Sequence, residues 1–178
     1  MLKKEYFCPM KNIIPILSAA ILICSACSQN KPLAQSATVS TDSLASVSQP
    51  LFARMKIQDS IKVGEPVTLK FTVYNTADTV QQFCKWHTPF EPLISKYLDV
   101  KNESGVEANY RGAMAKRIMP PPADSYIKVN PGDSLSVDVD VLKGYDVQSP
   151  GKYSISYSGQ NMSGLVLKDS VSFSYIKP

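Results

Sequence analysis

Residues 67–74 read VTLKFTVY, and this stretch decides the fold. Its apolar residues Val67, Leu69, Phe71 and Val73 occupy every second position, so they share one face of an extended chain. A period of two is typical of a half-buried antiparallel strand, whereas an amphipathic helix would need a period of 3.6. The stretch therefore predicts a strand with one face in a core and the other in solvent.

The same alternation recurs in three later stretches, residues 135–141, 153–158 and 171–175. Glycine and proline, which favour chain reversal, lie between the runs. Weaker strand patterns cover residues 52–60, 80–85, 93–101, 106–110 and 126–129. Eight or nine short strands in residues 50–178 predict an all-β fold, an antiparallel β-sandwich.

Two details favour an immunoglobulin-like sandwich. Tyr153 follows Pro150-Gly151 at the start of a late strand, where a tyrosine corner forms its backbone hydrogen bond. Trp86 is expected to end a central strand and to cover the core. The residues from Phe90 to Tyr97 contain a proline and predict a loop or one short turn.

The first part of the chain predicts export and lipidation. Ile13 to Cys24 is apolar and follows Lys11, as in a secretory signal, so residues 1–26 are interpreted as a signal peptide. Cys27 follows small residues, as in a bacterial lipobox, and is the predicted lipidation site; an ordinary signal peptide that contains cysteines is the alternative. Residues 27–49 predict a flexible tether. Ser28 favours the outer membrane of a bacterial envelope.

Composition excludes several classes of function. The formal charge of +4 includes the excess of lysine near the N-terminus, which leaves too small a surplus to indicate nucleic-acid binding. His87 is the only histidine, so the sequence cannot form a zinc site from two imidazoles or an HExxH motif. We expect no cofactor and no catalytic residue.

Three separated blocks stand out in the sequence. The first is KWHTPFE at residues 85–91, and the second is GAMAKR at residues 112–117. The third is GYDVQSPGKY at residues 144–153. In this order they resemble the immunoglobulin-like domain that precedes the catalytic domain in bacterial deuterolysin-type (aspzincin), lysine-specific zinc metalloendopeptidases.

The resemblance implies a module that accompanies a peptidase, without implying peptidase activity. His87 and Glu91 are four residues apart, but Pro89 prevents the regular helix that would place them together as ligands. We therefore expect a non-enzymatic, lipid-anchored envelope protein that binds a protein partner. An inhibitor or detached pro-domain of such a peptidase is one alternative, and a carbohydrate-binding module is another.

The first candidate binding site contains Trp86, His87, Pro89 and Phe90. These residues form either an exposed patch for a partner or a cap on the sandwich core. One interpretation of His87 is a functional residue that acts as an acid, a base or a ligand. The other is a loop histidine that hydrogen-bonds to the backbone. Cys84 is either a nucleophile paired with His87 or a small buried apolar residue.

The second candidate site is a basic, proline-rich loop that contains Met114, Lys116, Arg117 and Pro121. A stiff loop loses little entropy on binding, so it suits an interface; the alternative is a simple crossover between sheets. Alternating aspartates in residues 133–146 raise calcium as a possibility, but such carboxylates more often form a solvated strand face.

Overall fold

The computed structural model describes residues 49–178. The predicted signal peptide, Cys27 and nearly all of the predicted tether lie outside these residues. Within them no helix is both long and apolar enough to cross a bilayer. The elements in chain order are β1 (Leu51–Lys56), β2 (Ser60–Lys62), β3 (Thr68–Asn75), β4 (Gln81–Cys84), β5 (Leu98–Asn102), the 3₁₀ turn η1 (Ala123–Ser125), β6 (Tyr126–Val129), β7 (Ser134–Asp140), the 3₁₀ turn η2 (Val141–Lys143), β8 (Gly151–Tyr157), α1 (Gln160–Ser163) and β9 (Val171–Ile176).

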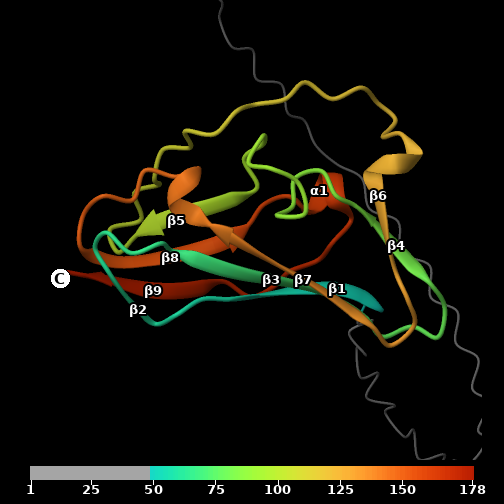
Figure 1. Ribbon diagram of the computed structural model, residues 1–178, viewed down its shortest axis with the longest axis horizontal. Coiled ribbons are helices and arrows are strands. Elements are labelled where there is room, and N and C mark those ends of the chain that lie inside the picture. The colour runs from blue at the N-terminus through green and yellow to red at the C-terminus, as the bar shows by residue number, and fades with distance from the viewer. Residues whose placement is uncertain (1–48) are drawn as a thin grey trace, which may run out of the picture. The chain divides into compact units, whose positions relative to one another are not determined.

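The strands form three sheets (Figure 1). One has the antiparallel order β1-β3-β7, and another has the order β2-β9-β8-β5, in which β2 runs parallel to β9. A separate ribbon joins β4 to β6. In residues 49–178 the nine strands and single four-residue α-helix confirm the predicted all-β immunoglobulin-like sandwich.

Burial follows the alternation that predicted the strands. On β3 the residues Leu69, Phe71 and Val73 are fully buried, whereas Lys70 between them is exposed. On β8 and β9, Ile155 and Phe173 occupy the same kind of inward position. The buried side chains form two apolar clusters, one between the two larger sheets and one around Phe71 that includes residues of the β4–β6 ribbon.

The tyrosine corner is present. Tyr153 lies at the start of β8, and its hydroxyl donates a hydrogen bond to the Ser149 carbonyl at 2.8 Å. The Tyr153 ring stacks on Phe173 of the neighbouring strand, with ring centroids 5.4 Å apart. The hydroxyl therefore fixes the loop before β8 while the ring belongs to the core, as predicted.

Three of the weaker strand predictions were inaccurate. The predicted strand at 52–60 is two strands, β1 and β2, which join different sheets. The predicted strand at 93–101 begins only at Leu98, because the preceding residues form a looped segment. Residues 106–110 form only isolated bridges at Glu107 and Tyr110.

The position predicted for Trp86 was also wrong in part. Trp86 follows β4, which is not a central strand, since it pairs only with β6. The indole is nevertheless buried, with 7% of its surface exposed. Short strands and loop bridges carry too little periodicity to show which sheet they join, because sheet membership depends on distant partners.

Candidate functional site

The chain turns sharply after β4. Thr88 stabilises this turn, since its hydroxyl donates to the Lys85 carbonyl at 2.6 Å and accepts the Phe90 N–H at 3.1 Å. Thr88 is fully buried and Pro89 is buried beside it. The turn therefore holds the first block of the sequence, KWHTPFE, in one compact arrangement.

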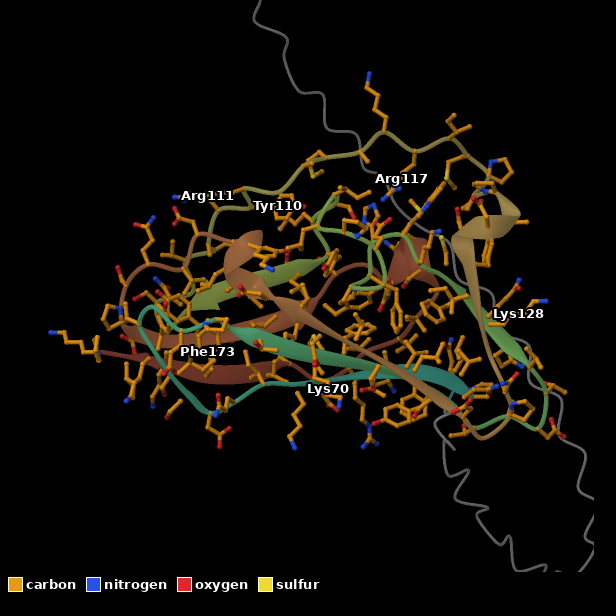
Figure 2. The ribbon with its side chains drawn as sticks, viewed as in Figure 1. Lys70, Tyr110, Arg111, Arg117, Lys128 and Phe173 are labelled. Carbon is orange, nitrogen blue, oxygen red and sulfur yellow. The ribbon has the colours of Figure 1, made fainter. Side chains whose placement is uncertain are left out.

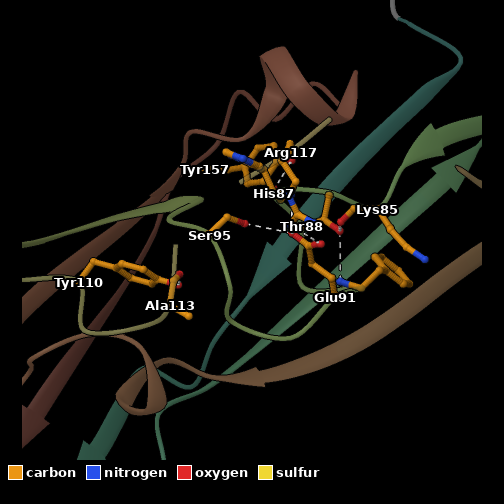
Figure 3. A network of polar contacts seen from close by, with 10 residues as sticks. Lys85, His87, Thr88, Glu91, Ser95, Tyr110, Ala113, Arg117 and Tyr157 are labelled. Atoms are coloured by element: carbon orange, nitrogen blue, oxygen red, sulfur yellow. Dashed lines mark hydrogen bonds and ion pairs between the residues drawn. The ribbon is translucent and has the colours of Figure 1, made fainter. Parts of the chain in front are cut away.

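Glu91 is the polar centre of this arrangement (Figure 3). Its carboxylate accepts hydrogen bonds from the His87 N–H at 2.9 Å and from the Ser95 hydroxyl at 3.0 Å. Arg117 Nη2 lies 2.6 and 2.7 Å from its two oxygens. Only 4% of the Glu91 side chain is exposed, so the partners replace the water that a carboxylate would otherwise need.

Arg117 lies between a carboxylate and an indole. Its guanidinium carbon is 4.7 Å from the centre of the Trp86 ring. A cation over an indole face is attracted by the ring quadrupole, and the attraction grows as water is excluded. Its Nε is buried with no hydrogen-bond partner among the described residues, so the site depends on Nη2 and on the ring.

The ion pair joins two of the unusual blocks in the sequence. Glu91 and Trp86 come from the block at 85–91, whereas Arg117 comes from the block at 112–117, on the loop that leads from β5 to β6. The third block contains Tyr145, whose ring packs against Tyr110 with centroids 5.2 Å apart. Asp146 from the same block forms an ion pair with Arg111. The first and third blocks therefore both contact the segment 110–117, which contains the second block.

His87 is held by its backbone. It has a positive φ of 57°, which is uncommon for a residue other than glycine. Its N–H donates to Glu91, and its carbonyl accepts from the Tyr157 hydroxyl at 3.0 Å. Burial lowers the pKa of His87 below 6.5; the Glu91 carboxylate opposes this effect, and the Arg117 cation adds to it.

Tyr157 and Gly159 complete the environment of His87. Burial raises the pKa of Tyr157, so its hydroxyl stays protonated and can donate. The same hydroxyl lies 2.6 Å from Ser163 Oγ on α1. A Cβ at Gly159 would lie 2.2 Å from the His87 carbonyl oxygen, so only glycine permits this close approach.

The structure decides between the alternatives for the first candidate site. The interpretation of Trp86 and Phe90 as an exposed patch was wrong. Trp86 is covered by Arg117, and Phe90 packs edge-on against Phe71 and Phe83. Trp86 and Phe90 instead cap the core, which was the alternative interpretation.

The proposed chemistry of Cys84 and His87 has no geometric support. Cys84 is 2% exposed and behaves as a small apolar core residue. Residues 49–178 contain no group of three histidine, cysteine, aspartate or glutamate side chains placed to hold a metal ion. Two of the aspartates considered for calcium have protein partners, the Leu142 N–H for Asp140 and Arg111 for Asp146.

The second candidate site is a loop with exposed apolar side chains. Met114 is 70% exposed, Ile118 85% and Met119 62%. Lys116 is exposed, Pro121 is half-buried, and the Arg117 charge is directed inward. The prediction of a basic loop was therefore wrong for Arg117, because Glu91 neutralises that cation.

Glu91 was missed as a central residue. Its position in the KWHTPFE block was noted only in relation to His87, and no spacing rule connects it to a residue 26 positions later. The sequence did contain one indication of the pair: the unusual block at 85–91 contains an acidic residue, and the unusual block at 112–117 contains an arginine. Ser95 and Tyr157 gave no such signal.

Comparison with known proteins identifies the family. The model of the immunoglobulin-like domain matches residues 54–170, about two thirds of the chain. The chain belongs to the immunoglobulin-like domain family. The match includes both halves of the Glu91–Arg117 pair and the tyrosine corner, so these features lie inside the immunoglobulin-like domain.

One curated relative of this domain is an extracellular protease from Aeromonas hydrophila, which is 32% identical over 96 residues. The match covers 52% of this chain and 26% of that protease. The chain thus spans about a quarter of the length of the curated relative it matches.

Two solved structures contain similar arrangements of strands. The CARDB domain of a Pyrococcus furiosus protein aligns over 72% of this chain and 94% of its own, with a TM-score of 0.38 and 11% identity. A β-glucosidase from Listeria innocua aligns over 71% of this chain and 16% of its own, with a TM-score of 0.35 and 10% identity. Nothing about function follows from similarities at this level.

Proposed function

We propose that the protein is a non-catalytic, protein-binding immunoglobulin-like module that accompanies a peptidase in the bacterial envelope. The observation that carries this proposal is the loop at 112–122, which exposes Met114, Ile118 and Met119 although its backbone is anchored. Large exposed apolar side chains that cluster on one element are typical of an interface. The buried Glu91–Arg117 pair supports a structural role for the polar residues nearby, in place of a catalytic one.

The anchoring of this loop favours binding. Tyr110 donates a hydrogen bond from its hydroxyl to the Ala113 carbonyl at 3.0 Å, and the Ala115 N–H donates to the Ile94 carbonyl at 2.8 Å. Arg117 fixes the middle of the loop, and three consecutive prolines, 120–122, stiffen its end. A loop held in this way loses little conformational entropy when a partner docks.

Two observations support a peptidase as the partner. The matching segment of the Aeromonas hydrophila relative belongs to an extracellular protease. The three blocks at 85–91, 112–117 and 144–153 resemble those of the domain that accompanies deuterolysin-type, lysine-specific zinc endopeptidases. Because the first block contacts Arg117 and the third block contacts Tyr110 and Arg111, this resemblance includes residues that hold the loop.

Lipid anchoring through Cys27 and an outer-membrane location belong to the same proposal. They rest on the apolar segment 13–24 and on the small residues before Cys27. Labelling of cells with a radioactive or clickable palmitate is expected to mark the wild-type protein and to leave Cys27→Ser unmarked. Equal labelling of both proteins would reject the anchor without affecting the binding module.

The binding proposal is tested with the full-length protein and a purified deuterolysin-type endopeptidase. We expect binding at micromolar concentration or tighter, and we expect the double variant Met114→Ser, Ile118→Ser to bind about tenfold or more weakly. Val106→Ser is the matched control, because Val106 is 62% exposed but lies outside the loop.

The outcomes separate the alternatives. Binding with inhibition of peptide hydrolysis identifies an inhibitor or detached pro-domain, whereas binding without inhibition identifies an accessory module. Absence of binding at micromolar concentrations, or an equal loss from Val106→Ser, would overturn the assignment of the partner or of the loop.

A further inference from the structure

The outer face of the β1–β3 pair carries a shallow hollow of about 380 Å³. It lies on the side of the sheet that faces away from the core. Figure 2 shows Lys70 pointing outward from this sheet, whereas Phe173 lies within the sandwich. The residues around the hollow are Arg54, Met55, Lys56, Lys70, Thr72 and Tyr74.

The strand register brings cations together in this hollow. Lys56 lies directly opposite Lys70. Arg54 lies opposite Thr72, and this pair is the next one on the same face of the sheet. Like charges directly opposite each other across two strands destabilise the pair. Among residues 49–178, neither Arg54 nor either lysine has an acidic group within ion-pair distance, so no ion pair within these residues neutralises the three cations.

The acidic residues on the third strand balance only part of this charge. Asp138 of β7 is the register partner of Lys70 on its other side, but the two do not form an ion pair. Asp140, the partner of Thr68, accepts the Leu142 N–H at 3.1 Å. Three cations and two carboxylates on this face of the sheet leave a local surplus of about one positive charge.

Polar and aromatic groups complete the hollow. Thr72 Oγ1 lies 2.8 Å from Ser136 Oγ, and either can be the donor; the hydroxyl that accepts this bond keeps its own O–H free to donate to a ligand. Tyr74 stacks on Phe52 with ring centroids 5.3 Å apart, and Arg54 lies 5.6 Å from the Phe52 ring. These contacts restrict Arg54, which makes its guanidinium better suited to bind a rigid oxyanion.

We propose that this hollow binds a phosphate group, with Arg54, Lys56 and Lys70 as its charged contacts and the Thr72–Ser136 hydroxyls as further partners. An anionic phosphate complements the local surplus of positive charge and can accept several charge-assisted hydrogen bonds. The group belongs either to a free phosphate or to a phospholipid headgroup, which share this chemistry. The inference is independent of the peptidase-binding proposal.

The test is lysine footprinting of the full-length protein in vesicles of neutral phosphatidylcholine. Acetylation rates of Lys56 and Lys70 are compared with that of Lys128, which is exposed on β6 and serves as the internal control (Figure 2). Millimolar inorganic phosphate is expected to slow acetylation of Lys56 and Lys70 about threefold or more, as an exposed charge pair allows. Chloride at the same ionic strength is expected to have no effect.

Two further arms make the result decisive. Arg54→Gln should abolish the protection, whereas Lys128→Gln should leave it unchanged. Vesicles that contain phosphatidylglycerol but no added phosphate distinguish the source, because protection there identifies the headgroup and protection only by inorganic phosphate identifies a free anion. The proposal is overturned when neither source protects Lys56 and Lys70, or when Lys128 is protected equally.

Discussion

The strand framework and the segment between β4 and β6 are stabilised in different ways. The framework buries alternate side chains such as Leu69 and Ile155, so its stability comes mainly from apolar burial. The segment at 85–125 has only one strand of its own, β5, and is held by the Glu91–Arg117 pair, Trp86 and side-chain bonds to turns. A loop segment can therefore be as well determined as a sheet when a buried polar group has several specific partners.

The largest expected effect breaks the framework. Phe173→Ala removes a ring that is 2% exposed and stacked on Tyr153, and we expect it to lower the free energy of unfolding by about 4 kcal/mol. Chemical denaturation measures the change. Ser172→Ala, an exposed neighbour on the same strand, should change stability by less than about 0.5 kcal/mol. Similar losses from both variants would contradict the role of apolar burial.

A smaller effect should be confined to the segment. Glu91→Gln leaves Arg117 largely buried without a countercharge, and we expect a loss of about 3 kcal/mol. The variant should increase the rate of hydrogen exchange at the Ala115 N–H, which bonds to Ile94. The exchange rates of amides in β3 and β8 should change less.

Two controls sharpen this comparison. The double variant Glu91→Leu, Arg117→Met should recover much of the lost stability, because it removes both charges. Arg111→Gln breaks the Arg111–Asp146 pair, whose arginine side chain is 57% exposed, and should cost less than about 1 kcal/mol. If Arg111→Gln lowered the free energy of unfolding as much as Glu91→Gln does, burial would not explain why the two ion pairs differ in their contribution to stability.

The smallest expected effect is a dependence on pH. Because burial holds the pKa of His87 below 6.5, the unfolded chain binds more protons than the folded chain between that lowered value and 6.5. The contribution of His87 to the free energy of unfolding should therefore rise with pH up to about 6.5 and stay level above it. The difference between wild type and His87→Gln, measured by denaturation from pH 5 to 8, isolates this contribution. A difference that falls as pH rises would contradict it.

Much of the framework could be predicted from residues that are close in sequence. The period of two in residues 67–74 marks β3, and Pro150-Gly151 before Tyr153 marks the tyrosine corner. Cys84 was expected to be a buried apolar residue, and it is. These features depend on local geometry and on the free energy of apolar burial, both of which a short sequence carries.

Other features were decided only by the tertiary structure. Lys56 meets Lys70 because β1 pairs with β3, and Glu91 meets Arg117 because two loop segments pack together. The packing of the loop turned Arg117 inward over Trp86 and left Met114 and Ile118 exposed. The types of these side chains could be read from the sequence, but their burial and partners could not. For Lys56 and Lys70 a shift of one residue in strand register would have reversed the face on which each side chain lies, and loop residues such as Arg117 have no periodicity that indicates their partners.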